Sequence, residues 1–376
     1  MSNEVLIELG VEELPARFID DAVQQMFNKT TAWLTDNRIK YEHVYTFATP
    51  RRLAVHIVGV ADIQESLEEE VRGPSVEIAK DKTGAWTKAA VGFSKGQGKT
   101  VDDLYIKSVN QKSYVFLNKK TDGQRTIQLL PEFGEILSSI QFPQTMQWGD
   151  QSFKYARPIR WIVALYNQTI IPFEIANVQT GRTTYGHRFL GQAIDINHPS
   201  DYETLLEQQY VIVDPNKREM RILKGIQSLE ETHGFKVIIK DKLLQEVRNL
   251  VEYPTVFHGQ FDETYLELPA DVLITTMEEH QRYFPVENGN NQLTNIFIGV
   301  RNGDDQALEQ VIKGNEKVLH ARLSDAQFFY EEDKQVPIHE NLAKLDRVVF
   351  QEQLGSMGDK VQRVKKVTES LANLMK

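Results

Sequence analysis

The first 60 residues constrain the fold most, because their hydrophobic spacing changes from that of a strand to that of a helix and back. Apolar residues between Leu14 and Trp33 recur about one helical turn apart, which predicts one buried helix face. Pro15 stands early in this helix, where a missing backbone N–H breaks no helical hydrogen bond. Strand, helix, strand, strand in this order predicts a two-layer α+β module over residues 1–62. The three predicted strands are residues 4–9, 44–49 and 51–60.

The rest of the chain keeps alternating between the two kinds of spacing. Two apolar segments separated by Asn167 and Gln168 predict a hairpin. The acidic run at residues 65–71 predicts a solvated connector, and the chain after residue 338 predicts helix. The apolar face of this last helix comprises Leu342, Leu345, Val349 and Leu354. Further predicted helices cover about 125–140, 214–233, 269–280 and 306–332, and further predicted strands cover 104–109, 113–118 and 295–300.

These patterns predict a multidomain α+β fold with mixed or antiparallel sheets, packed helices and a helical C-terminal end. A length of 376 residues fits two or three domains. We expect the small module 1–62, an α+β accessory region over 63–335, and the start of a helical domain over 336–376.

The composition excludes several classes of protein. The sequence has no cysteine, which excludes disulfides and thiolate metal sites. No segment approaches the ~20 continuous apolar residues of a membrane span, and the N-terminus carries carboxylates where a secretory signal carries lysines. We therefore expect a cytoplasmic protein that does not enter a membrane. A formal net charge of −10 argues against coating by nucleic acid but allows a local basic patch.

One glycine-rich stretch, AAVGFSKGQGKT at residues 89–100, is similar to a phosphate-binding loop. That loop needs a second glycine upstream of Gly98, at the position where this sequence has Phe93. Trp86, Ala90 and Phe93 instead follow helical spacing. The stretch therefore predicts a short helix that ends in glycines.

No catalytic residue and no metal site is predicted. Glu278, Glu279 and His280 are adjacent in a predicted helix, so their side chains point to different faces and do not easily share one metal ion. Glu12 and Glu13 form a pair of carboxylates that suits either acid–base chemistry or the favourable negative charge at a helix N-terminus.

Residues 154–191 form a basic, aromatic segment within this acidic chain. Five lysines and arginines stand there against one acidic residue, Glu174, with aromatic residues between them. Arginine binds phosphate through paired hydrogen bonds and aromatic rings stack on bases, so the segment suits RNA. A sheet with arginines on its solvated face would give the same pattern. The basic residues are Lys154, Arg157, Arg160, Arg182 and Arg188.

Taken together, the longer sequence blocks closely resemble the N-terminal part of the β subunit of bacterial heterotetrameric glycyl-tRNA synthetase. The matching blocks include IELGVEELP (7–15), FATPRRLAV (47–55), TKAAVGFSKGQG (87–98), RPIRWIVALY (157–166), GHRF (186–189), EVRNLVEYPTVFHGQF (246–261), LPADVLITTMEEHQRYF (268–284) and GNEKVLHARLSDAQFFYEEDK (314–334). The sequence departs from the family at Gln144 and Gln147, where members usually carry basic residues. Members of the family are also considerably longer.

The resemblance implies a non-catalytic subunit that supports tRNA binding and assembly for the ATP-dependent charging of tRNA with glycine. It implies that ATP and Mg²⁺ are bound by a separate α subunit, so we expect no cofactor on this chain. The implied partners are the α subunit, tRNA(Gly) and a second β subunit in an α2β2 assembly. It further implies an accessory region similar to B3/B4-type domains and an HD-type helical domain from about residue 340.

For tRNA contact the sequence nominates six basic residues, namely Arg157, Arg160, Arg182, Arg188, Arg282 and Lys317. Two alternatives stay open. One is a hydrolase of the tRNA-editing type, for which His187 and Arg188 would be the residues to test. The other is a purely structural scaffold for subunit assembly.

Overall fold

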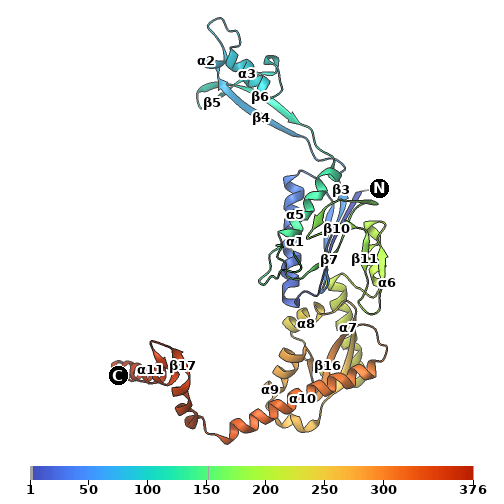
Figure 1. Cartoon of the computed structure of the whole chain (residues 1–376), viewed down its shortest axis with the longest axis vertical. Helices are drawn as coiled ribbons and strands as arrows, with labels where there is room; N and C mark the ends of the chain where they lie inside the picture. Colours follow the sequence, from blue (N-terminus) through green and yellow to red (C-terminus); the bar gives the residue numbers. More distant parts are fainter. Residues whose placement is uncertain (1–2, 151, 376) are drawn as a thin grey trace. The chain divides into compact units, whose positions relative to one another are not determined.

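The computed structural model describes residues 3–150 and 152–375 (Figure 1). The chain forms two compact units, which are described separately. The first extends to Met220 and is completed by Arg248–Pro254, and the second comprises Arg221–Val247 and the chain from Thr255 onward. The expected multidomain α+β fold with mixed sheets is confirmed. The three domain boundaries derived from the sequence stay a prediction.

The first unit is built on one mixed sheet, whose strands are β1 (Asn3–Val11), β2 (His43–Thr49), β3 (Arg52–Val60), β7 (Ile159–Tyr166), β8 (Thr169–Ile170), β9 (Glu174–Ile175) and β10 (Val178–Gly181). The strand order is β2-β3-β1-β7-β10-β9, and β8 also pairs with β7. Pairing is antiparallel from β2 to β7, whereas β10 runs parallel to β7. The strands predicted in the N-terminal module are confirmed, and so is the β7–β8 hairpin, in which Asn167 takes a φ of 51°.

Side chains of β1 alternate between the two faces of this sheet and so divide the core into two layers. One layer lies against α1 (Ala16–Asp36), the helix predicted from the sequence, and contains Val5, Ile7, Leu9, Phe18, Ile19, Ala22 and Met26. The opposite layer lies under α6 (Tyr202–Gln208) and contains Leu6, Phe47, Trp161, Val163, Tyr202 and Leu206. Glu8 follows Leu6 by two residues and therefore points into this second apolar layer, where it is fully buried. A buried carboxylate needs partners, and these define the site described below.

Four further elements of the first unit are short, namely α4 (Thr126–Leu129), α5 (Phe133–Ser138), β11 (Thr183–Tyr185) and β12 (Ala193–Asp195). The helix predicted near 125–140 is divided by a 3₁₀ turn at Leu130–Glu132 that contains Pro131. Proline lacks the N–H that a continuous helix would use there, which explains the division.

Residues 67–121 form a small sheet of their own with the order β4-β6-β5. Its elements are β4 (Leu67–Ser75), α2 (Val76–Ala79), α3 (Lys88–Gly96), β5 (Tyr105–Val109) and β6 (Lys112–Thr121). The prediction of a solvated connector at 65–71 is wrong, because most of that run belongs to β4. Glu68 and Glu69 lie opposite Lys120 and Lys119 on β6. Opposite charges across an antiparallel pair stabilise the extended conformation of this acidic run.

The glycine-rich stretch folds as the predicted short helix, α3, rather than as a phosphate-binding loop. Ala90 is buried against Val115 of β6, and Phe93 packs beside them. After the helix, Gly98 adopts a φ of 70°, a conformation that turns the chain away at little cost for glycine.

The second unit contains a sheet with the order β13-β15-β16-β14. Its strands are β13 (Lys236–Val237), β14 (Pro254–Gln260), β15 (Phe284–Glu287) and β16 (Leu293–Asn302). The helices of this unit include α8 (Asp241–Arg248), α9 (Ala270–Thr275), α10 (Leu308–Gln335) and the part of α7 (Pro215–His233) that follows Met220. The predicted helix 269–280 starts as α9 and continues as a π-helical turn, Thr276–Gln281. Leu319 and Leu323 of α10 are buried in one hydrophobic cluster with Phe297 and Tyr283, which forms the core of this unit.

We expect the second unit to lose stability in acid because of His258 on β14. Burial, followed by the charge of nearby His233, lowers the pKa of His258 below its usual 6.5, while Glu316 opposes the shift. The folded state therefore favours the neutral ring, so stability should fall as the pH drops below 6.5 through the lowered pKa. Melting temperatures of the parent chain and His258→Gln at about pH 7.5 and 5.5 check this. The melting temperature of the parent chain should fall more on acidification than that of His258→Gln. Equal falls would contradict the prediction.

The C-terminal segment differs from the continuous helix predicted after residue 338. A 3₁₀ segment, Ile338–Arg347, precedes β17 (Val349–Gln351) and β18 (Gly355–Ser356), and α11 (Met357–Leu374) follows. Gly355 takes a φ of 83°, and Ser356 and Asp359 exchange the two hydrogen bonds of a capping box. These residues begin a new helix rather than continue an old one. The expected helical C-terminal end is confirmed, but not over its full length.

Within residues 3–150 and 152–375, no helix combines the length and the apolar character needed to cross a membrane.

Candidate functional site

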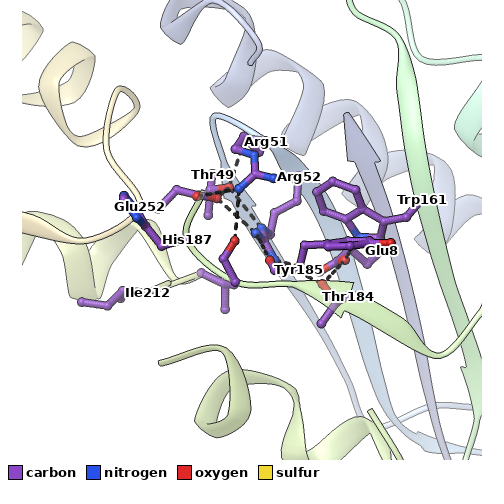
Figure 2. A network of polar contacts seen from close by, with 12 residues as sticks. Glu8, Thr49, Arg51, Arg52, Trp161, Thr184, Tyr185, His187, Ile212 and Glu252 are labelled. Carbon is purple, nitrogen blue, oxygen red and sulfur yellow. Dashed lines mark hydrogen bonds and ion pairs between the residues drawn. The ribbon is translucent and has the colours of Figure 1, made fainter. Parts of the chain in front are cut away.

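The most polar part of the first unit's core surrounds Glu8 (Figure 2). Its carboxylate accepts hydrogen bonds from Trp161 Nε1 on β7, Thr184 Oγ1 on β11 at 2.6 Å, and Tyr202 Oη on α6. Burial, followed by the negative charge of Glu8, holds the pKa of Tyr202 well above its usual range. The phenol therefore keeps its proton and acts as a donor to the carboxylate.

Arg52, the first residue of β3, brings a positive charge into the same layer and is fully buried. One terminal nitrogen lies 3.5 Å from Glu8 Oε2, and the other lies 3.2 Å from Glu252 Oε1. The second nitrogen also donates to the backbone carbonyl of Tyr185 at 2.7 Å. Burial opposes the charge of Arg52, but Glu252 and Glu8 outweigh it, and the pKa of Arg52 is raised. A charged guanidinium therefore lies between two carboxylates.

Glu252 belongs to the segment Arg248–Pro254, which returns to the first unit after a part of the second. Thr49 Oγ1 donates to Glu252 Oε1 at 2.7 Å. Four residues earlier, Arg248 forms an ion pair with Glu219 at 2.6 Å. The returning segment is thus held to the sheet at Glu252 and to α7 at Arg248.

Arg218 on α7 is fully buried and also binds the returning segment Arg248–Pro254. Its guanidinium donates to the backbone carbonyls of Arg248 at 3.0 Å, Ile212 at 2.7 Å and Val213 at 3.1 Å. Burial lowers the pKa of Arg218 to about 10, and the carboxylate of Glu252 opposes the shift. The guanidinium remains positively charged at neutral pH.

A cavity of about 380 Å³ adjoins this buried network, and it is lined by Val11, Glu12, Arg51, Arg160, Trp161, Tyr185 and Arg188. Trp161 and Tyr185 belong to both regions. Trp161 bonds Glu8 through its indole nitrogen, and Tyr185 accepts from Arg52 through its backbone carbonyl. Their ring centroids lie 5.0 Å apart with the planes inclined by 59°. Two aromatic rings therefore line the cavity, and that of Trp161 is bonded to the buried network through its indole nitrogen.

The charged groups of the cavity are three guanidinium groups and one carboxylate. Glu12 lies 3.3 Å from Arg160 Nε and 2.9 Å from a terminal nitrogen of Arg188. Glu13 approaches Arg188 more loosely, at 3.7 Å. The side chains of Arg160 and Arg188 are 61% and 43% exposed, so these pairs contribute only ~0–1 kcal/mol each. An incoming anion can therefore compete with Glu12 for both arginines.

The third guanidinium, Arg51, is less exposed than the other two. It donates to the carbonyl of Gly186 at 3.1 Å and lies 3.5 Å from Glu252. Burial lowers the pKa of Arg51, and Glu252 opposes the shift. Arg51 also lies over the Trp161 ring at 5.6 Å, so it connects the cavity with the buried network.

The structure bears on one of the two interpretations of Glu12 and Glu13, that of a helix N-terminus. Helix α1 begins at Ala16 and has no acidic residue in its first turn, so the two carboxylates do not cap it. The helix-terminus interpretation is wrong, and the actual partners of Glu12 and Glu13 are arginines.

Of the nominated arginines in the first unit, Arg160 and Arg188 line the cavity. Arg157 lies close by, because its Nε donates to the carbonyl of Glu13 at 3.0 Å. Arg182 lies elsewhere, donating to the carbonyl of Gln168 beyond the end of β7 at 3.2 Å. The basic segment 154–191 therefore does not form one continuous patch.

The remaining nominated residues belong to the second unit. Arg282 takes a φ of 59° at the end of the π-helical turn and pairs with Glu246 at 2.8 Å, which suits a structural role. Lys317 is exposed on α10. His187, considered for an editing reaction, is 3% exposed and is not among the residues that line the cavity.

In the part of the chain that the structure describes, no group of three or more His, Asp or Glu residues is arranged to hold a metal ion. In the segment that the sequence singled out, Glu278 instead pairs with Lys240 at 2.8 Å. The residues that line the cavity include no serine, lysine or histidine. The groups that line it, three guanidinium groups and two aromatic rings, suit an anion beside an aromatic surface.

The buried residues next to the cavity, namely Glu8, Arg52, Tyr202 and Glu252, were not predicted from the sequence. One signal was available, because a single carboxylate inside the apolar strand VLIELGV must find a partner. The structure also brings together five of the blocks that carry the family resemblance, around residues 7–15, 47–55, 157–166, 186–189 and 246–254.

Comparison with known proteins agrees with this resemblance. The family model described as "Glycyl-tRNA synthetase beta subunit" matches residues 5–376. The glycine–tRNA ligase β subunit of Oceanobacillus iheyensis is 52% identical over 372 residues, which cover 99% of this chain and 54% of the relative. That of Bacillus subtilis is 50% identical over 370 residues, or 98% of this chain and 54% of the relative. The chain thus spans about half the length of these curated relatives.

Proposed function

The chain belongs to the glycyl-tRNA synthetase β-subunit family, and from this premise we propose that it is the part of a β subunit that holds tRNA(Gly) for charging elsewhere. In this proposal ATP, glycine and Mg²⁺ bind to a separate α subunit. The chain supplies tRNA contacts and subunit contacts within a cytoplasmic α2β2 assembly. In this proposal the first unit contacts tRNA through its cavity.

The observation that supports this proposal is the cavity with three guanidinium groups and two aromatic rings. Guanidinium groups bind phosphate through paired hydrogen bonds, and aromatic rings stack on bases of every type. Both kinds of group stand within one cavity on a chain of net charge −10, so the positive charge is local. Local positive charge favours contact with one part of an RNA over coating of the whole molecule.

Neutralising the two exposed arginines of the cavity tests the proposal. In the double variant Arg160→Gln/Arg188→Gln, affinity for tRNA(Gly) should fall, because two contacts to phosphate are lost. The slope of log K against log salt should become shallower by about 2, or roughly one for each lost contact. Titrations of labelled tRNA(Gly) at several salt concentrations, with and without the α subunit, measure both quantities.

The control variant is Lys224→Gln, which removes one exposed charge on α7 at a residue that does not line the cavity. It should leave affinity and slope unchanged. If the double variant binds tRNA like the parent chain and still forms a complex with the α subunit, tRNA contact at this cavity is refuted. The structural scaffold then becomes the better account.

A further inference from the structure

We propose that the cavity beside Trp161 accepts one unpaired nucleotide of an RNA strand, and that Glu12 competes with its phosphate for Arg160 and Arg188. This inference rests on the proposed tRNA-binding function and specifies what part of the RNA enters the site. Four features of the cavity support it.

The volume of the cavity limits the size of the ligand that it can accept. A volume of about 380 Å³ lies near the lower end of the ~300–1,000 Å³ typical of ligand cavities. That space suits one base with its sugar and phosphate. A base-paired helix cannot enter, because its bases are stacked and its groove edges do not present a free ring face.

The ring of Tyr185 offers a stacking surface that the fold does not need elsewhere. The buried network uses only the backbone carbonyl of Tyr185, and the residue is 43% exposed. Its ring contacts Trp161, which keeps it over the cavity. A base that enters can therefore stack on a ring that is already in position.

The ring of Trp161 has more fixed contacts than the ring of Tyr185. Its indole nitrogen bonds the buried carboxylate of Glu8, and the Arg52 guanidinium lies 5.5 Å from its ring centre. Gly10 pairs with both Arg52 and Trp161 in the sheet, and an added Cβ there would lie 2.0 Å from the indole ring. The absence of a side chain at Gly10 thus lets the ring lie across β1. This fixed ring forms part of the cavity wall.

Glu12 occupies the two arginines that a phosphate would use. It contacts both guanidinium groups, at 3.3 Å for Arg160 and 2.9 Å for Arg188. In the free chain this carboxylate holds the two cations close together despite their mutual repulsion. When a phosphate binds, it must replace at least part of these contacts. Glu12 therefore limits the affinity of the site for phosphate.

The test measures binding of a labelled single-stranded octanucleotide RNA, of a blunt RNA duplex and of tRNA(Gly) to the full chain by fluorescence anisotropy. Tyr185→Ala should weaken binding of the single strand roughly 5- to 100-fold, the effect of removing one stacking ring. Glu12→Gln should strengthen it several-fold, because the neutral amide no longer forms ion pairs with the arginines. Binding of the duplex should respond to neither change.

Tyr45→Ala is the matched control, since Tyr45 on β2 is 46% exposed and does not line the cavity. It should bind the single strand like the parent chain. Removing the unpaired 3′ nucleotides of tRNA(Gly) identifies the source of the nucleotide. If trimming abolishes the effect of Tyr185→Ala, the nucleotide comes from the 3′ end, and if the effect persists, it comes from a loop.

Single-strand binding that is unaffected by both Tyr185→Ala and Glu12→Gln would overturn the inference. A weaker complex with Glu12→Gln would also overturn it, because the carboxylate would then support binding rather than compete with it. If in either case tRNA(Gly) still depends on Arg160 and Arg188, the proposed function stands and only the nucleotide site fails. If no RNA binds, both fail.

Discussion

Replacing Arg52 with methionine is expected to lower the free energy of unfolding of the first unit by about 3–5 kcal/mol. Arg52 lies between Glu8 and Glu252, and all three side chains are buried. Methionine is also unbranched but carries no charge, so Glu8 would stay buried without a cation and Glu252 would keep its contact with Arg51 at 3.5 Å. Breaking a buried ion pair from one side costs much more than the pair itself contributes, because the remaining charge is left unpaired.

Urea unfolding, monitored by tryptophan fluorescence, measures this effect in the first unit. The chain has four tryptophans, Trp33, Trp86, Trp148 and Trp161, and all of them belong to the first unit. The matched control is Arg125→Met, because Arg125 is 63% exposed and lies 3.8 Å from Asp62. An exposed pair of this kind should contribute only ~0–1 kcal/mol. A loss for Arg52→Met no larger than that of the control would contradict the prediction.

Replacing Gly10 with alanine is expected to destabilise the first unit by about 1–3 kcal/mol and to weaken RNA binding at the cavity. The new methyl group would lie 2.0 Å from the indole ring of Trp161, which cannot happen without displacement of the ring or the strand. Because Trp161 also donates to Glu8, displacement would break a buried hydrogen bond. Unfolding curves and single-strand binding of the same variant measure the two consequences.

Gly92→Ala provides a control of opposite sign. Gly92 lies within α3, and no atom lies within 4 Å of the position that its Cβ would take. Alanine stabilises a helix interior relative to glycine by roughly 0.5–1 kcal/mol. Both changes add one methyl group, but only the methyl group at position 10 would meet an indole ring. If Gly10→Ala is as stable as the parent chain, Trp161 is not held as proposed.

Much of the local structure could be predicted from hydrophobic spacing. The N-terminal strands, α1, α3, α7 and α10 were expected close to the bounds that the structure gives. In each of these elements the apolar pattern and the local turn residues agree. The acidic strand β4 was missed because its partner β6 lies far along the chain, and cross-strand charge pairing is invisible in a local window.

The candidate site was predicted only in part. Arg160 and Arg188 were nominated by charge and aromatic neighbours, and both line the cavity. Arg182 and Arg157 carry the same signal, yet the fold uses their guanidinium groups to bond backbone carbonyls. Charge in a sequence shows which residues can bind phosphate, but the strand register and the neighbouring carbonyls decide which of them face the cavity.

What the amino-acid sequence determined by itself was the class of the fold, the order of most elements and the family, because these depend on short-range spacing and on contiguous blocks. Only the tertiary structure decided that Glu8 points into an apolar layer and that Arg52 meets Glu252, a residue 200 positions away. The physical reason is that a buried charge is stable only where several distant segments bring partners to it. Those same segments shape the cavity, so its position could not be read before the chain was folded.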